Sequence, residues 1–383
     1  MQTLTKIPDN YTLTKYFAPF YELYSVKSLP VHVECDRMLA RVLDFVNKKA
    51  GVPLSVSGGR ELSIPVSERP EDGKRKVFVA LSGGKDCLAT AIMAKKEGLD
   101  PVLVYISGVN RSLFSERRCA QQAAAEAGFG YIEIKAGISG SKEWNEHPLK
   151  NILLLCMLID EGALHGVTDY AFGSTFDDDS TYWSLDYDLS DSFDMIHMFT
   201  LFVRQHIPGF RLHQYMCNTM QSFYTVYRYN PRIIPLLSTC ITPDYRRPVI
   251  RKRNESLYGG DVLHPNGCGS CYKCADYYLF SQSFGMVRSS REYARRCMQA
   301  KMAFDRNYVG DFKFDRTGFN RYGGRDTDEV QVLADRCGYY IGKLQYDREL
   351  NKWFTDTAFG HKHYHEREQA ERVLERFKKL YRV

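Results

Sequence analysis

Residues 77–87 read Val-Phe-Val-Ala-Leu-Ser-Gly-Gly-Lys-Asp-Cys, a short apolar run followed by a turn with two glycines. The apolar run at 77–81 predicts a buried β-strand, and the periodicity of residues 87–96 predicts a helix. Two glycines allow a tight turn whose backbone N–H groups face an anion, and the helix directs the positive end of its dipole at the same point. The stretch therefore predicts a strand–loop–helix unit that binds phosphate.

Two side chains in this loop suggest how the phosphate is held. Ser82 can donate its hydroxyl to a phosphate oxygen, whereas the Asp86 carboxylate needs a cation beside it. Mg²⁺ bridging Asp86 and pyrophosphate oxygens is the natural interpretation. The alternative is a plain turn in which Asp86 caps the helix. We favour phosphate binding because the full string follows a β-rich run directly.

Outward from the loop, strand and helix patterns alternate. Further helices are predicted at 116–127 and 149–165, and further strands at 102–106, 131–135, 170–173 and 233–237. Strands that alternate with helices at this spacing predict an α/β fold with a parallel, Rossmann-like sheet of five strands. The strands are almost continuously apolar, which is typical of a sheet covered by helices on both faces.

The flanks of this region carry separate patterns. Residues 35–50 have the spacing of an amphipathic helix, and the charged stretch 67–76 predicts a linker. Residues 339–359 predict a β-hairpin. The predicted helices are a basic one at 288–306 and an amphipathic one at 366–381. His361, His363 and His365 alternate as in a strand, and we expect them to be solvated rather than metal-bound.

Composition limits the class of protein. The chain has 383 residues and a net charge of +6, with 44% hydrophobic and 13% aromatic residues, which excludes disorder throughout. No window approaches the ~18 uninterrupted apolar residues of a membrane helix. The polar start of the chain lacks the apolar segment of a secretory signal. We therefore expect a cytoplasmic protein with no membrane partner.

Three of the eleven cysteines lie close together, at Cys268, Cys271 and Cys274. An odd cysteine count in a chain of this length argues against a disulfide framework, and this spacing suits Zn²⁺, which prefers four tetrahedral N or S ligands. Cys240 is our choice for the fourth ligand, and His264 is the alternative. An iron–sulfur cluster could use the same thiolates. A chance cluster of buried thiols is the remaining interpretation.

The loop string resembles the SGGxDS signature of the PP-loop ATP pyrophosphatases, which include NAD and GMP synthetases, tRNA-lysidine synthases and tRNA thiolases. The resemblance implies the Rossmann-like fold of the adenine nucleotide α-hydrolases, with ATP and Mg²⁺ bound and ATP cleaved between its α and β phosphates. It implies catalytic roles for Ser82, Lys85 and Asp86. The implied nucleotide-binding residues are these three with Gly83, Gly84, Cys87 and Gly173. Cys87 stands where the family has serine, and a thiol is a weak donor.

The cysteine arrangement resembles one branch of that superfamily, the 7-cyano-7-deazaguanine synthases (QueC) of queuosine biosynthesis. This resemblance implies a structural zinc on Cys240, Cys268, Cys271 and Cys274. In the family the first cysteine lies only a short way before the other three, whereas 27 residues separate Cys240 from Cys268 here. The basic insert that fills this gap can alter the entrance of the pocket.

Weaker similarities to the same branch follow the predicted strands. They cover residues 107–116, 172–178 and 187–193, and imply substrate contacts for Arg111, Asp177, Asp188 and Phe193. In the third segment the family's Cys-Arg pair is replaced by Leu189 and Ser190, so the substrate stays open. For Asp177 and its neighbours a capping role is about as well supported as a ligand role.

The resemblance implies an ATP-dependent ligase that adenylates a carboxylate on a deazapurine and transfers ammonia to it, forming an amide or a nitrile. It covers roughly residues 75–290. We divide the chain into an N-terminal extension (1–75), a PP-loop core (76–240), a zinc-binding and helical subdomain (241–306) and a C-terminal α+β extension (307–383).

Other functions stay open because the flanks lie outside the resemblance. The runner-up is a diverged QueC-like enzyme of a phage or an antiviral defence system, whose flanks hold DNA, tRNA or a protein. A tRNA-thiolating or lysidine-type enzyme is a third hypothesis, and a nucleotide- or zinc-dependent binding module without turnover is a fourth. A homodimer also stays open.

Overall fold

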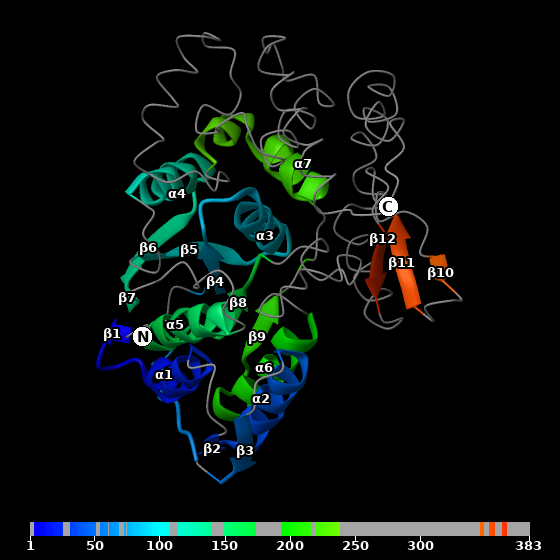
Figure 1. The fold of residues 1–383 in the computed structure, drawn as a ribbon. Helices are drawn as coiled ribbons and strands as arrows, with labels where there is room; N and C mark the ends of the chain where they lie inside the picture. The colour runs from blue at the N-terminus through cyan, green and yellow to red at the C-terminus, as the bar shows by residue number, and fades with distance from the viewer. Residues whose placement is uncertain are drawn as a thin grey trace.

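Figure 1 shows the chain as a computed structural model. The structure describes residues 4–25, 31–50, 54–59, 61–68, 73, 75–107, 114–138, 149–173, 193–213, 215, 219–237, 345–347, 352–356 and 362–365.

The central element is a parallel sheet of five strands in the order β6-β5-β4-β8-β9. The chain runs from β4 outward to β6, then crosses back to β8 and β9 on the other side of β4. This doubly wound order confirms the predicted α/β, Rossmann-like sheet. The strands are β4 (Lys76–Leu81), β5 (Asp100–Ser107), β6 (Gly130–Lys135), β8 (Asp169–Ala171) and β9 (Arg211–His213).

Helices cover both faces of this sheet (Figure 1). On one face α3 (Lys85–Lys96), α4 (Phe114–Ala127) and α7 (Thr219–Tyr229) pack over Val77 and Val79. On the other face α5 (Lys150–Leu164) and α6 (Phe193–His206) pack with Phe78. Val77, Phe78 and Val79 thus point to alternate faces of the sheet and are all buried, as the continuous apolar run predicted.

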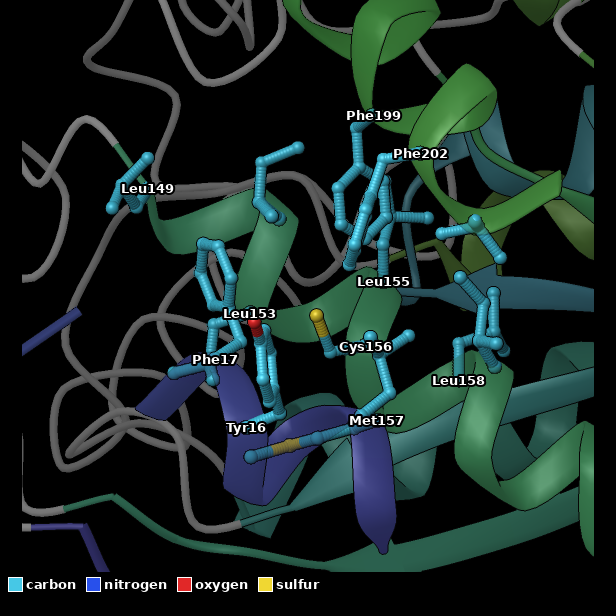
Figure 2. Packing of buried hydrophobic residues seen from close by; sticks show 14 of the residues in the cluster. Tyr16, Phe17, Leu149, Leu153, Leu155, Cys156, Met157, Leu158, Phe199 and Phe202 are labelled. Atoms are coloured by element: carbon cyan, nitrogen blue, oxygen red, sulfur yellow. The ribbon is translucent and has the colours of Figure 1, made fainter. Parts of the chain in front are cut away.

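The N-terminal region shares the second of these cores. Its helices are α1 (Thr12–Ser25) and α2 (Arg37–Ala50). Figure 2 shows Tyr16 and Phe17 of α1 packed against Leu153, Cys156 and Met157 of α5. The ring of Phe17 meets Phe199 of α6 edge-on, with centroids 6.4 Å apart. The region also has the strands β1 (Leu4–Lys6), which pairs with β7 (Gly137–Ile138), and β2 (Val31–Cys35), which pairs with β3 (Leu54–Gly58).

Two carboxylates fix the starts of the N-terminal helices. Asp160 of α5 accepts hydrogen bonds from the backbone amides of Leu13 and Thr14 at 2.9 and 2.7 Å, and so caps α1 from a distant part of the chain. Asp36 accepts the amide of Met38 at 2.7 Å and caps α2. The predicted helix at 35–50 is confirmed, and it begins at Arg37 because of this cap.

The predicted fifth strand at 233–237 is wrong. Pro231–Leu236 form a 3-10 helix, η3. Pro231 and Pro235 have no backbone N–H to donate to a strand ladder, and the Asn230 side chain caps the turn by accepting the Arg232 amide at 3.0 Å. The fifth strand is instead β9, whose three residues follow α6.

The described part of the C-terminal region is a small antiparallel sheet. It contains β10 (Gln345–Asp347), β11 (Lys352–Asp356) and β12 (Lys362–His365). The predicted hairpin is confirmed. His363 and His365 lie in β12, and His361 lies outside the described residues. The predicted helices at 288–306 and 366–381 lie outside the described residues. Among the helices described, none has the length and apolarity to cross a membrane.

Candidate nucleotide site

The loop of residues 82–84 joins the carboxyl end of β4 to α3. The sheet order reverses at this strand, with β5 on one side and β8 on the other. In open α/β sheets, ligands bind outside the carboxyl ends of the strands at such a reversal. The loop therefore lies at the position where this fold forms a ligand site.

The backbone of the loop leads into α3 without a side-chain cap. Gly83 has φ of +80°, a left-handed conformation in which a side chain would be strained. Gly84 is the N-cap residue in an extended conformation, and it supplies no capping side chain. No side chain caps the start of α3, and the helix dipole favours an anion there.

Gly173, just past the end of β8, touches the same turn. A Cβ at this position would lie 2.9 Å from the Cys87 nitrogen and 3.0 Å from the Asp86 carbonyl carbon and the Cys87 Cα. Such distances are shorter than real Cβ contacts, so glycine is needed for β8 to approach α3 this closely. The structure thus brings Gly173 beside the loop, and its role in nucleotide binding stays a prediction.

Ser82 and Cys87 face each other across the loop. Their Oγ and Sγ atoms are 3.4 Å apart, with Ser82 exposed and Cys87 buried. Burial raises the pKa of the Cys87 thiol, and the Ser82 hydroxyl acts in the opposite direction. Cys87 is therefore a neutral thiol against the Ser82 side chain. It stands where the PP-loop signature that this loop resembles has its last serine hydroxyl.

Lys85 and Asp86 form an ion pair at the first turn of α3. The Lys85 ammonium lies 2.8 and 2.7 Å from the two carboxylate oxygens of Asp86. The Lys85 side chain is 9% exposed and that of Asp86 28%. The sequence led us to expect a cation beside Asp86, and the Lys85 ammonium occupies that place. The carboxylate oxygens are also hard donors of the kind Mg²⁺ prefers, and the amides of the loop suit phosphate. The donor set thus fits Mg²⁺ and a nucleoside triphosphate.

Most other predicted site residues cannot be compared with the structure. Phe193 is the first residue of α6, and only its backbone is described. Within the described ranges no group of three His, Cys, Asp or Glu could hold a metal ion. The residues outside the described ranges are the predicted substrate contacts Arg111, Asp177 and Asp188 and the predicted zinc ligands Cys240, Cys268, Cys271 and Cys274.

A charged cluster at the opposite edge of the sheet was not predicted. The Arg75 guanidinium donates two hydrogen bonds to Asp169, at 2.8 and 2.6 Å, and His213 Nε2 lies 2.9 Å from the same carboxylate. Burial alone would raise the pKa of Asp169, but the hydrogen bonds from His213 and Arg75 outweigh it and hold this pKa at about 2. The cluster fastens β8 and β9 to the start of β4. The only signal in the sequence was an acidic residue directly before a predicted strand.

Comparisons with known proteins add little to this geometry. No protein-family model and no curated protein matches the chain. Among solved structures, a predicted subunit of tRNA methyltransferase from Methanocaldococcus jannaschii is similar over 47% of this chain and 88% of its own. The identity is 18% and the TM-score is 0.26. A likeness at this level supports no conclusion about function, and the fold assignment rests on the strand order.

Proposed function

We propose that the protein binds ATP with Mg²⁺ at residues 82–87 and cleaves it between the α and β phosphates to adenylate a substrate. The observation that carries this proposal is the left-handed turn at Gly83, which leads from the carboxyl end of β4 into the start of α3, where no side chain caps the first turn. The resemblance of the loop to the PP-loop signature supports the same activity. A Walker-type loop is not an alternative, because the chain has no GxxxxGK[ST] string.

The chemistry assigned to the loop is stabilisation of charge. A carboxylate oxygen of the substrate attacks the α-phosphorus, the bond to the β-phosphate oxygen breaks, and pyrophosphate leaves. The amides of α3 and the Lys85 ammonium would then hold the charge that develops on the leaving oxygens. Bound Mg²⁺, held by Asp86, would neutralise part of this charge. The acyl-adenylate has AMP as its leaving group, and ammonia displaces it to give an amide.

We infer the substrate class from the resemblance alone: a deazapurine that carries a carboxylate, converted to an amide and, after a second activation, to a nitrile. A zinc ion on Cys240, Cys268, Cys271 and Cys274 belongs to the same proposal. A nucleic-acid or protein acceptor is the second candidate. It is favoured by the folded sheet of β10, β11 and β12, which lies beyond the part of the chain covered by the resemblance.

The test follows AMP, pyrophosphate and product mass with ATP, Mg²⁺, ammonium and 7-carboxy-7-deazaguanine, and it measures zinc content in parallel. We expect pyrophosphate release that Asp86→Asn abolishes. Asp100→Asn, at the start of β5 and therefore at the opposite edge of the sheet, should leave it intact. If AMP forms only in the presence of tRNA, DNA or a protein, the substrate is that macromolecule and not the deazapurine. Release that survives Asp86→Asn would show that the loop is not the site.

A further inference from the structure

The position of the Lys85 side chain is unusual for a lysine. Neighbouring residues on a helix do not normally face each other, yet the Lys85 ammonium bonds both carboxylate oxygens of Asp86. Lysine is almost never fully buried unless it is paired, and Lys85 as a whole is 7% exposed. Its charge is therefore largely removed from solvent and paired with the Asp86 carboxylate.

This position is electrostatically costly without a nearby anion. The positive end of the α3 dipole disfavours a cation at the first turn, and burial of an ammonium is expensive unless an opposite charge accompanies it. Asp86 supplies that charge. Two positive sources, the ammonium and the helix terminus, thus converge beside one carboxylate. Such an arrangement gains most when an anion with several charges, such as a triphosphate, binds at the start of α3.

The Asp86 carboxylate, however, cannot bind the Lys85 ammonium and a metal ion through the same oxygens at once. Both Asp86 oxygens already accept from Lys85, at distances typical of strong charge-assisted hydrogen bonds. A Mg²⁺ ion that binds Asp86 must displace at least one of them. The Asp86 side chain is more exposed than that of Lys85, 28% against 9%, so an arriving ion reaches the carboxylate from its solvent side.

We propose, on the basis of the nucleotide site proposed above, that Lys85 is a positioning residue that holds the place of the metal ion on Asp86 in the nucleotide-free protein. With nucleotide and Mg²⁺ bound, Lys85 would give up the Asp86 carboxylate to the ion and turn its ammonium to the phosphate oxygens. The exchange keeps Asp86 paired in both states and couples the metal to the nucleotide. Metal alone binds poorly, because it must displace the ammonium from the carboxylate.

The first measurement is binding of Mn²⁺, as a spectroscopic substitute for Mg²⁺, in the absence of nucleotide. Lys85→Gln should raise the Mn²⁺ affinity by about tenfold, the order expected when one strong competing contact is removed. Lys85→Arg, which keeps the charge, should leave the affinity low. Lys96→Gln removes the same charge at the far end of α3 and should have no effect. The double variant Lys85→Gln/Asp86→Asn should lose the added Mn²⁺ binding.

The second measurement is ATP binding in EDTA, which reports the new partner of the ammonium. Lys85→Gln should weaken it by about tenfold, and Lys85→Arg should restore most of it. Circular dichroism and thermal denaturation identify a variant that fails to fold, in which case Lys85→Met replaces Lys85→Gln. Unchanged Mn²⁺ affinity in a folded Lys85→Gln or Lys85→Met would overturn the proposal. Absence of ATP binding to the wild-type protein would instead overturn the proposed function, while the Mn²⁺ titration still decides whether Lys85 competes for Asp86.

Discussion

Replacing Gly173 with alanine tests how closely the end of β8 approaches the nucleotide loop. The added Cβ would lie 2.9 Å from the Cys87 nitrogen, about 0.5 Å inside ordinary contact at 3.4 Å. The three nearest atoms are all backbone of the first turn of α3, so no side-chain rotation relieves the clash. Overpacking of this kind costs about 1–3 kcal/mol. If the loop moves to absorb it, ATP affinity should fall by between about fivefold and about 150-fold.

Calorimetric ATP titration and thermal denaturation of the wild type, Gly173→Ala and Gly59→Ala provide the measurement. Gly59 is the matched control because a Cβ there meets open space, so Gly59→Ala should change neither quantity. Wild-type affinity together with wild-type stability in Gly173→Ala would refute the close approach itself. Reduced stability with unchanged affinity would place the strain in β8, and Gly173 would then have no part in the nucleotide site.

Two further predictions concern the packing behind the site. Gly162→Ala should lower the free energy of unfolding, measured by urea denaturation, by about 2–3 kcal/mol, because the new Cβ collides with the ring of Tyr170. This ring cannot move aside easily, since its hydroxyl donates to the Val167 carbonyl at 2.7 Å. Wild-type stability in the variant would contradict this prediction. Burial raises the pKa of Asp160 to about 6, from 3.8 in the unfolded chain, although the Thr14 hydroxyl and amide oppose the shift. The stabilisation linked to this raised pKa is complete below pH 4 and is lost as the pH rises through 6. The wild type should therefore lose up to about 3 kcal/mol of its stability advantage over Asp160→Asn between pH 4 and pH 7. If the difference in unfolding free energy between the two proteins does not change with pH, the pKa of Asp160 is not raised.

The strands show which parts of the fold could be predicted from sequence. β4, β5 and β6 have six to eight residues each, and their apolar runs are long enough to reveal a buried strand. β9 is a three-residue edge strand that reads Arg-Leu-His, and it is only partly covered, so it has no recognisable pattern. The run at 233–237 has the composition of a strand, but its neighbouring prolines prevent ladder hydrogen bonds.

The candidate site divides in the same way. The loop could be predicted because glycine conformation, helix start and phosphate binding are local properties of one short string. The contact of Gly173 with the Cys87 amide depends on how β8 packs against α3, and the resemblance rather than any spacing suggested this residue. The Lys85–Asp86 pair depends on a side-chain conformation at one helical turn, which no periodicity specifies.

The N-terminal region is connected to this site through a continuous series of contacts. Asp160 of α5 caps α1, and the Tyr170 ring of β8 packs directly over the backbone of Gly162, two residues farther along α5. β8 leads in turn to Gly173, whose backbone lies against the first turn of α3. Close packing limits how far one of these buried groups can shift without its neighbours, so we expect residues that hold α1 on α5 to influence the distance between β8 and the nucleotide loop. On this basis we expect the geometry of the loop to depend on packing by residues far from it in the sequence, as well as on its own residues.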